Sequence, residues 1–343
     1  MATIRDVALY AQVSASTVSH VINGTRFVDQ GTRERVCAAI DALGYRPNAL
    51  ARSLRRGETN IIGLLVPDNA NPFFAELAHV IEEAGFSRGY NLILCNSEAS
   101  ATKETSYMRV LLSRQIDGLI LIPAGNYHGA LEAASSEGLP VVIVDRGLSD
   151  WPVDQVSADN ELGGYLAGQH LASLGHRCVG CISGPGEATS SSYRLKGFRR
   201  ALQEGGIELS ERAIIQADFR YASGEQAMAR LLQELPGITA VFAANDLMAL
   251  GAMNALRKAC LSVPADISVI GFDDIFLAAA MYPALTTIAQ PVKEMGQVSV
   301  SLLLERIKQR TSYTPARVVL PTTLIERESC RYIGNNGPGS QEA

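Results

Sequence analysis

Polar side chains follow directly on the apolar runs of this 343-residue chain. Runs rich in Ile and Val recur from residue 60 onward, and most of them end in Asp, Asn, Arg or Gln. The residues at these ends are Asp68 and Asn69, Asp145 and Arg146, Asp218 and Phe219, Asn245 and Asp246, Asp273 and Asp274, and Gln290. If the runs are parallel strands, their carboxyl ends share one edge, which is where open α/β sheets bind ligands. The spacing therefore predicts a ligand site at that edge.

The residue types in this set suit a sugar. Asp, Asn, Arg and Gln offer donors and acceptors to hydroxyl groups, and aromatic rings offer flat apolar faces to the C–H side of a sugar ring. Phe73 and Phe74 follow Asn71, which is predicted to cap a helix, and Phe219 supplies a third ring. Arg194 lies early in another predicted helix. A single Asp or Asn at a strand end is commonly only a helix cap, so the prediction rests on the whole set.

A sugar-acting enzyme and a transport binding protein are the competing interpretations. The sequence contains no GxxxxGK[ST], HExxH or GxSxG motif, and GPGEAT at 184–189 lacks the third glycine of GxGxxG. No His stands at a strand end beside an acid, and no nucleophile is placed for activation. We therefore expect a protein that is not an enzyme and that binds a small effector without a cofactor. The first sixty residues decide against the transport alternative.

Continuous apolar strands separated by helical stretches are typical of parallel sheets covered by helices on both faces. The length suits two such sheets, with a boundary near residue 160, and the segments LTTIAQP and VVLPTTLIER are predicted to cross back between two lobes. The run CVGC has metal-ligand spacing, but in a strand Cys178 and Cys181 point to opposite faces. Because no second pair is nearby, we expect buried thiols and no metal site.

The first sixty residues differ in charge from the rest. They hold eight Arg and five acidic residues, a net charge of +3, while the whole chain carries −5, so the remainder carries −8. A basic head on an acidic body indicates a polyanionic partner. No apolar stretch approaches the roughly 18 residues of a membrane span, and the first 30 residues hold no apolar leader. We therefore expect a cytoplasmic protein without a membrane partner.

Three short helices are predicted in this head. The first is capped by Thr3, and its apolar residues over 4–11 share one face. The second follows the N-cap Ser14 and turns small polar side chains away from its apolar stripe, and after a loop at 26–32 a third helix carries apolar residues over 36–43. Two helices joined by a tight turn, the second with short polar side chains, are typical of a DNA-binding helix-turn-helix. An ordinary amphipathic helix with a solvated polar face is the alternative.

The segment TIRDVALYAQVSASTVSHVINGTRFVDQGTRERVCAAIDALGYRPNALARSL resembles the headpiece of the LacI family of transcriptional repressors. Its forms STVSH and NALARSL resemble the branch of purine and ribose repressors. The resemblance implies that Ala15, Ser16 and His20 face the bases of an operator. It implies phosphate contacts for Thr17 and Ser19. Because position 15 is Ala, it offers a methyl contact and no hydrogen bond.

The segment PNALARSL at 47–54 resembles the hinge helix of that family. The resemblance implies that Asn48 caps this helix, that Ala51 packs near the floor of the minor groove, and that Leu54 wedges between bases at the operator centre. We expect the DNA-binding residues to be Thr3, Ala15, Ser16, Thr17, Ser19, His20, Asn23, Arg26, Asn48, Ala51, Leu54 and Arg55.

Residues 60–330 resemble the periplasmic sugar-binding fold that forms the effector domain of the same family. The positions that match ribose-binding proteins are Asn71, Phe73, Phe74, Asp145, Arg146, Arg194, Phe219, Asn245, Asp273 and Gln290. The resemblance therefore implies D-ribose as the effector, and another pentose, a hexose, and a purine or nucleoside are left as alternatives. Whether the effector acts as inducer or corepressor is left open as well.

The expected fold is an all-α helix-turn-helix headpiece followed by an α/β, periplasmic-binding-protein-like effector domain of two parallel-sheet lobes. We expect the headpiece over 1–46, a hinge helix and linker over 47–59, and a flexible tail over 331–343. The N-lobe is expected at about 60–160 and 291–320, and the C-lobe at about 161–290 and 321–330. The tail has no leucine heptads, so the resemblance implies a homodimer on palindromic double-stranded operator DNA.

Overall fold

The computed structural model describes residues 2–24, 26–45, 58–125, 129–148, 151–309 and 314–334. The chain forms two compact units, Met1–Thr59 and Asn60–Ala343. The first contains the predicted headpiece and the second the predicted effector domain. Four of the predicted DNA-binding residues lie outside the described residues, namely Asn48, Ala51, Leu54 and Arg55. Over the described ranges, no helix is long and apolar enough to span a membrane.

Side-chain caps start the first two helices of the headpiece. Helix α1 (Ile4–Ala11) begins at a capping box, in which the backbone N–H of Asp6 donates to the Thr3 hydroxyl and the backbone N–H of Thr3 donates to the Asp6 carboxylate. Helix α2 (Ala15–Asn23) begins after Ser14, whose hydroxyl accepts a first-turn backbone N–H at 3.1 Å. The two helices are the predicted helix-turn-helix pair.

The third headpiece helix starts earlier than the sequence indicated. Helix α3 (Gln30–Ala42) takes in the last residues of the predicted loop at 26–32, because the Asp29 carboxylate accepts the backbone N–H of Thr32 at 2.9 Å and caps the helix. The apolar faces of the three helices meet in one core. Its buried members are Val7, Ala8, Ala11, Val18, Val21, Val36 and Ala39.

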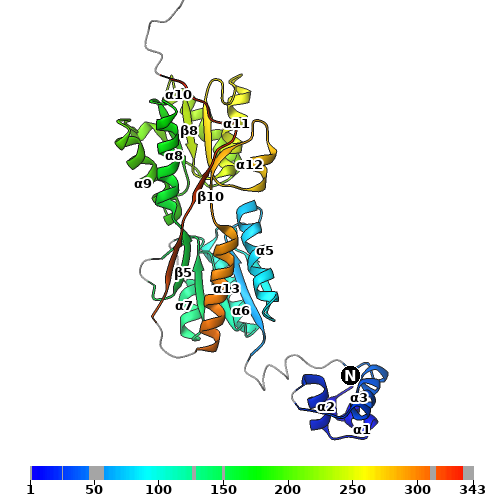
Figure 1. The fold of residues 1–343 in the computed structure, drawn as a ribbon. Helices are drawn as coiled ribbons and strands as arrows, with labels where there is room; N and C mark the ends of the chain where they lie inside the picture. Colours follow the sequence, from blue (N-terminus) through cyan, green and yellow to red (C-terminus); the bar gives the residue numbers. More distant parts are fainter. Residues whose placement is uncertain are drawn as a thin grey trace, which may run out of the picture. The chain divides into compact units, whose positions relative to one another are not determined.

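Six parallel strands form the sheet of the N-lobe (Figure 1). In spatial order they are β11 (Arg317–Leu320), β5 (Asp154–Ala158), β4 (Val141–Val144), β3 (Gly118–Leu121), β1 (Ile61–Val66) and β2 (Asn91–Asn96). Two helices pack on each face, which buries the central strands on both sides. One face carries α5 (Pro72–Phe86) and α13 (Val292–Lys308), and the other carries α6 (Ala101–Ser113) and α7 (Gly129–Ser136).

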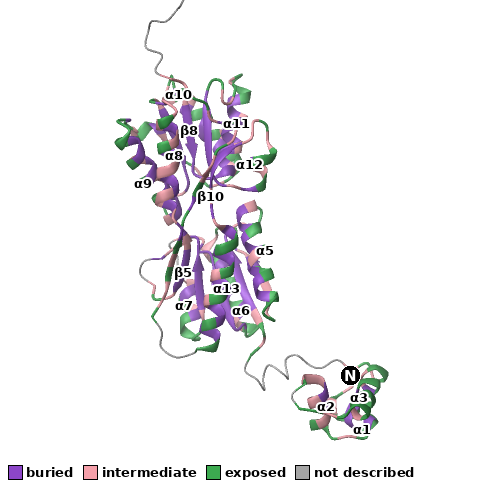
Figure 2. Ribbon diagram, in the orientation of Figure 1, coloured by how far each residue is buried: buried purple, intermediate pink, exposed green. Residues whose placement is uncertain are grey.

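The C-lobe repeats this architecture. In spatial order its strands are β12 (Thr323–Ile325), β10 (Thr286–Ala289), β9 (Ser268–Asp273), β8 (Ala240–Ala243), β6 (Val179–Ser183) and β7 (Ile214–Gln216), and only the β10–β12 pair is antiparallel. One face carries α8 (Asn160–Ser173) and α9 (Thr189–Glu204), and the other carries α10 (Tyr221–Glu234) and α11 (Asp246–Lys258). Two short helices, η1 (Glu211–Ala213) and α12 (Phe276–Ala280), complete the lobe. Figure 2 shows the strands of both lobes largely buried, with exposed residues on the outer faces of the helices.

The chain passes between the lobes three times, after β5, after β10 and after β11. The boundary near residue 160 is the first passage, and the two segments predicted to cross back are the other two. The fold class is therefore as expected, with two departures in detail. Strand β5 was not predicted. Residues 331–334, expected to begin a flexible tail, are instead held by the C-lobe, because the Arg331 backbone N–H donates to Ser268 and that of Ile333 donates to Leu174.

Candidate functional site

The ten predicted effector residues form one connected group where the two lobes meet. The N-lobe contributes the end of β4 and the first turn of α5. The C-lobe contributes the ends of β8, β9 and β10, the start of α9 and the loop before α10. The buried members are Asn71, Phe73, Phe74, Asp145, Arg146, Arg194, Asn245, Asp273 and Gln290, and Phe219 is half-buried. The structure thus brings together residues from the ends of β4, β7, β8, β9 and β10. Five other strand-end residues lie outside this group, namely Asp68, Asn69, Asp218, Asp246 and Asp274.

Arg194 anchors the C-lobe side of this group. Its Nε donates to Asn160 Oδ1 at 2.7 Å, and its Nη1 donates to the Ala244 carbonyl at 2.6 Å and lies 3.3 Å from Asp273 Oδ1. The guanidinium carbon also lies 3.7 Å from the centroid of the Phe272 ring. Gln290 Nε2 donates to the same Asp273 oxygen at 2.7 Å. Asp273 is therefore held by two donors from different elements.

Arg146 occupies the N-lobe side and reaches across to the C-lobe. Its Nη1 donates to the Pro123 carbonyl at 3.1 Å, and its Nε lies 3.8 Å from the Asp145 carboxylate. Its guanidinium carbon lies 5.8 Å from the Phe74 ring centroid and 5.7 Å from the Phe219 ring centroid. One ring belongs to the N-lobe and the other to the C-lobe, so this cation stands between aromatic faces of both lobes.

The group places two carboxylates and two guanidinium groups out of contact with bulk water. Burial raises the pKa of Asp145, and Arg194 and Arg146 oppose that shift. Burial also raises the pKa of Asp273 to about 7, again opposed mainly by Arg194. The pKa of Arg146 is lowered by burial. Charges this deeply buried are stable only when they are paired and hydrogen-bonded. The two guanidinium groups therefore compensate the two carboxylates within the group.

Three buried polar atoms of this group have no hydrogen-bond partner within the described residues: Asp145 Oδ1, Arg146 Nε and Gln290 Oε1. Such atoms are rare in folded proteins, and each costs about 1–3 kcal/mol. Two of them are acceptors and one is a donor. Because a hydroxyl group both donates and accepts, hydroxyl groups of a ligand suit acceptors and donor alike.

Three members of the group adopt a left-handed backbone conformation, although none is glycine. The φ angles are 67° at Asp145, 68° at Phe219 and 111° at Asp273. These conformations cost free energy, and they cluster at ligand sites because the surrounding structure holds functional side chains in orientations that relaxed backbone does not provide. The strain is shared between the lobes, since Asp145 belongs to the N-lobe and the other two to the C-lobe.

Sequence reasoning missed three residues that shape the group. Asn160 holds Arg194, but it follows the unrecognised strand β5 and was not counted as a strand end. Glu104 is buried on α6 and accepts the Ala124 backbone N–H at 2.8 Å, which fixes the loop that Arg146 also binds. Gly184 leaves space for the Phe219 ring, because a Cβ at this position would lie 2.2 Å from the ring. Only the glycine carried a signal in the sequence, as the first residue of GPGEAT.

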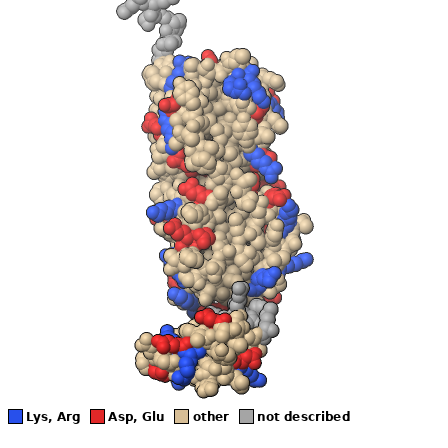
Figure 3. Space-filling view, turned by 90° about the vertical axis from the view of Figure 1, so that its right-hand side faces the viewer, with Lys and Arg blue, Asp and Glu red and all other residues tan. Residues whose placement is uncertain are grey.

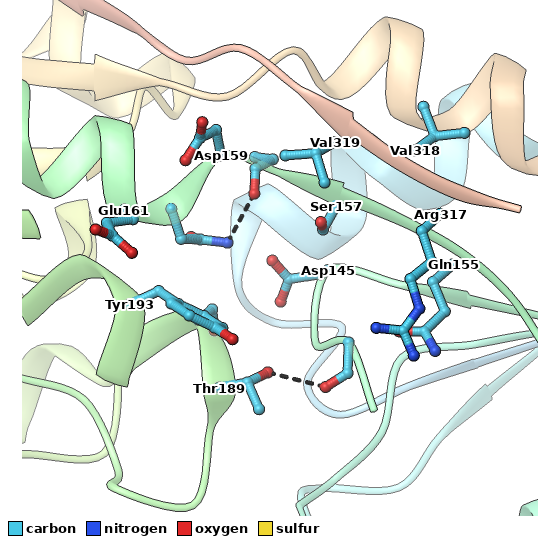
Figure 4. A pocket seen from close by; sticks show the side chains of 14 residues that line it. Asp145, Gln155, Ser157, Asp159, Glu161, Thr189, Tyr193, Arg317, Val318 and Val319 are labelled. Atoms are coloured by element: carbon cyan, nitrogen blue, oxygen red, sulfur yellow. Dashed lines mark hydrogen bonds between the residues drawn. The ribbon is translucent and has the colours of Figure 1, made fainter. Parts of the chain in front are cut away.

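A cavity of about 330 Å³ adjoins the group on the side of the crossover segments (Figure 4). Asp145 from the N-lobe and Thr189 and Tyr193 from the C-lobe line it. The Thr189 hydroxyl donates to the Gly147 carbonyl at 3.2 Å, a hydrogen bond that joins the two lobes across the cavity. The cavity therefore provides space beside Asp145, between the two lobes.

The headpiece presents six of the predicted DNA-binding residues on helix α2, with Arg26 shortly after that helix and Thr3 at the start of α1. Ala15 and Ser16 are exposed, as are Thr3 and Arg26, while Thr17, Ser19, His20 and Asn23 are half-buried. The Asn23 amide donates to the Ser19 carbonyl at 2.7 Å and to its hydroxyl at 3.2 Å, so it orients Ser19. His20 and Arg26 line one shallow hollow with the exposed ring of Phe27. Two donors that suit phosphate or base edges therefore share one surface.

Two other features of the effector domain bear on its chemistry. Cys178 and Cys181 pack into clusters on opposite faces of the C-lobe sheet, as predicted, and no group of three metal ligands occurs in the described ranges. Figure 3 shows basic and acidic side chains interspersed over the visible face of the effector domain, without a continuous patch of one sign. That face carries no surface suited to a polyanion.

Two family descriptions match the chain. Residues 3–48 match bacterial regulatory proteins of the lacI family, and residues 59–332 match the periplasmic binding proteins and sugar binding domain of the LacI family. The chain is 42% identical over 331 residues to the HTH-type transcriptional repressor PurR of Proteus mirabilis, covering 96% of this chain and 97% of that protein. It is 41% identical over 330 residues to the ribose operon repressor of Escherichia coli, covering 96% and 100%.

Solved structures of LacI-family proteins also match the chain. The lac repressor dimer bound to operator and the anti-inducer ONPF matches with a TM-score of 0.86 at 30% identity, covering 96% of this chain and 99% of that chain. A LacI family transcriptional regulator from Enterococcus faecium with bound ribose matches with a TM-score of 0.72 at 35% identity, covering 80% and 100%. The chain therefore belongs to the LacI family, and it is a DNA-binding transcriptional repressor controlled by a small effector rather than an enzyme.

Proposed function

We propose that the effector is D-ribose and that the ten-residue group between the lobes is its site. The observation that carries this proposal is the set of three unpartnered polar atoms, on Asp145, Arg146 and Gln290, beside the rings of Phe74 and Phe219. A pentose offers hydroxyls to the acceptors and the donor, and its C–H faces pack against the two rings. The ribose operon repressor of E. coli and the ribose-bound regulator of E. faecium, both similar to this chain, support the same choice.

A purine or nucleoside that acts as corepressor is the second candidate. The 42% identity to PurR of P. mirabilis favours it. The chemistry of the site favours the sugar, because each edge atom of a purine base is fixed as a donor or as an acceptor. The site alternates carboxylate oxygens with guanidinium donors over a short span, as at Asp145 and Arg146. Hydroxyl groups adapt to such alternation because they rotate between donating and accepting.

The regulatory scheme follows from two lobes and a separate headpiece. A homodimer in the cytoplasm presents two headpieces to a palindromic operator, with Ser16 and His20 on base edges and Leu54 at its centre. Ribose stabilises contact between the lobes, which displaces the hinge segments and releases the DNA, so that genes for sugar uptake and catabolism are transcribed. Because binding is reciprocal, operator DNA weakens ribose binding by the same factor as ribose weakens operator binding.

Calorimetric titration of the full-length protein with ribose, other pentoses, fructose and hypoxanthine tests the effector. We expect ribose to bind at least about tenfold more tightly than the other sugars, a difference of about 1.4 kcal/mol. Operator affinity is measured by fluorescence anisotropy at fixed salt, with and without ribose, and shows whether ribose weakens or strengthens operator binding. Tight binding of hypoxanthine with strengthened operator binding would replace this proposal by the corepressor scheme.

A further inference from the structure

Asp246 is a fully buried carboxylate at one of the predicted strand ends, but it is not among the ten predicted effector residues and takes part in no salt bridge given by the structure. It is the first residue of α11, directly after the site residue Asn245. Its Oδ1 accepts the hydroxyl of Thr287 at 2.6 Å, and its Oδ2 accepts the backbone N–H of Ile275 at 2.9 Å. A buried carboxylate that accepts a backbone N–H fixes the position of that peptide group.

The peptide that Asp246 holds belongs to a strained turn. Asp273 and Asp274 precede Ile275, and their φ angles are 111° and 58°, so two consecutive residues are left-handed without being glycine. The turn is also held from its other side, because Arg327 Nη2 lies 2.6 Å from the Asp274 carboxylate. Strained backbone persists only where surrounding contacts over-determine it, and these two contacts do so.

The space for the Asp246 carboxylate is provided by a glycine in strand β9. A Cβ on Gly271 would lie 2.1 Å from Asp246 Oδ1, which no real side chain tolerates. Gly271 stands opposite Thr287 in the β9–β10 pair, so the carboxylate lies over the two strands at the point where both contact it. The site for Asp246 is therefore built by three elements: α11, β9 and β10.

The turn makes one contact within the proposed effector site and another with the N-lobe. Asp273 carries the carboxylate that Arg194 and Gln290 bind in the effector site. Two residues later, the side chain of Ile275 packs, 2% exposed, into the N-lobe core cluster that contains Phe73 and Phe74. A rigid turn of three residues therefore joins an effector contact to an apolar contact between the lobes.

We propose that Asp246 is a positioning residue that couples effector binding to contact between the lobes. It keeps the Asp273–Ile275 turn in its strained shape, so that Asp273 meets the effector while Ile275 docks against the N-lobe. Without Asp246, the turn relaxes, Asp273 leaves its bonded position and Ile275 no longer docks in register. This inference rests on the proposed function for the identity of the effector, and on the turn geometry for the role of Asp246.

Two substitutions of Asp246 distinguish the loss of its two hydrogen bonds from the loss of its carboxylate group. Asp246→Ala removes both hydrogen bonds. Asp246→Asn keeps them, because its amide oxygen accepts the Ile275 N–H and its amide nitrogen donates to the Thr287 hydroxyl, which also accepts. Asp154→Ala is the matched control: Asp154 is likewise fully buried, but it binds Arg306 in the N-lobe, at the opposite end of strand β5 from the effector site.

Ribose affinity by calorimetry is expected to fall about tenfold or more in Asp246→Ala and to stay within about threefold of wild type in Asp246→Asn. Asp154→Ala is expected to lower the thermal midpoint and leave ribose affinity within about threefold. Equal losses of affinity in the Asn and Ala variants, or an equal loss in Asp154→Ala, would overturn the positioning role.

A second readout needs no ligand. In the ligand-free full-length protein, hydrogen exchange of a peptide covering residues 268–280 is expected to accelerate about tenfold or more in Asp246→Ala and not in Asp246→Asn. Unchanged exchange in Asp246→Ala would overturn the inference. If ribose fails to bind wild type, the proposed effector is wrong, and this exchange comparison alone decides the role of Asp246.

Discussion

Replacing Arg194 by alanine is expected to abolish the response to ribose and to leave operator binding by the ligand-free protein intact. The side chain is 3% exposed and makes two short hydrogen bonds, to Asn160 Oδ1 at 2.7 Å and to the Ala244 carbonyl at 2.6 Å, besides its ion pair with Asp273. Alanine removes all three. It also removes the cation that stacks on Phe272.

The loss of stability in Arg194→Ala follows from the unpaired charge that the substitution leaves buried. Breaking a buried ion pair by removing one partner costs about 3–5 kcal/mol, because the other charge stays buried and uncompensated. Here that charge is Asp273, whose pKa already stands at about 7 with Arg194 present. Without Arg194 its pKa rises further, so proton uptake relieves part of the penalty near neutral pH. We therefore expect a loss of stability of about 3 kcal/mol and a loss of ribose affinity of about 100-fold or more.

The assay compares Arg194→Ala with Arg200→Ala on the same helix. Arg200 is half-exposed and binds Glu161 at the surface, so its loss is expected to change stability by no more than about 0.5 kcal/mol. Thermal denaturation, ribose calorimetry and operator anisotropy are measured for both variants. Ribose affinity within threefold of wild type in Arg194→Ala would refute the reasoning. Joint loss of operator binding would show that the headpiece depends on this anchor.

Four further substitutions test the site and the headpiece. Gly184→Ala places a Cβ 2.2 Å from the Phe219 ring, so calorimetry is expected to show about tenfold weaker ribose binding, partly restored by adding Phe219→Leu; wild-type affinity in the single variant contradicts this. The folded pKa of Asp273 is raised from 3.8 to about 7, so the stability tied to its protonation is present below pH 3.8 and lost as pH rises to about 7. The Asp273→Asn side chain does not titrate, so the variant lacks that loss. The thermal midpoint of the variant minus that of wild type is therefore expected to be larger at about pH 8 than at about pH 5. An equal difference at both pH values contradicts the assignment. Ser16→Ala and His20→Ala are each expected to weaken specific operator binding by about 1–3 kcal/mol in anisotropy titrations with ribose affinity unchanged, and a uniform loss on unrelated DNA would reassign them to phosphate contacts.

Features that depend on neighbouring residues could be predicted from the sequence. The caps at Thr3 and Ser14 form within one helical turn, so their residue types and spacing suffice to place the start of α1 and α2. The strands of the effector domain are continuous apolar runs because both faces of each sheet are covered by helices. Asp145, Asn245 and Asp273 could be placed at strand ends for the same reason, since each directly follows or closes such a run.

Strand β5 could not be predicted in this way, because its buried polar residues are satisfied by partners outside the strand, and Asp154 finds its partner far away in the chain. Asp154 is fully buried in β5 and binds Arg306, 152 residues later. Gln155 is also buried there, and its amide bonds the backbone of Leu148. Read locally, the segment DQVSA looks like a loop, since buried charge is tolerated only with a partner that the local sequence does not reveal. Asn160, which follows this strand, was missed for the same reason.

The sequence by itself determined which chemical groups stand at the strand ends, and the resemblance carried by its first fifty residues determined the family. The tertiary structure decided how those groups pair: Arg194 meets Asp273 across 79 residues, and Arg146 meets a ring from each lobe. It also decided the left-handed turn that Asp246 holds and the raised pKa of Asp273. Pairing, strain and pKa depend on burial and on charges brought from distant segments, and these exist only once the two lobes have folded and met.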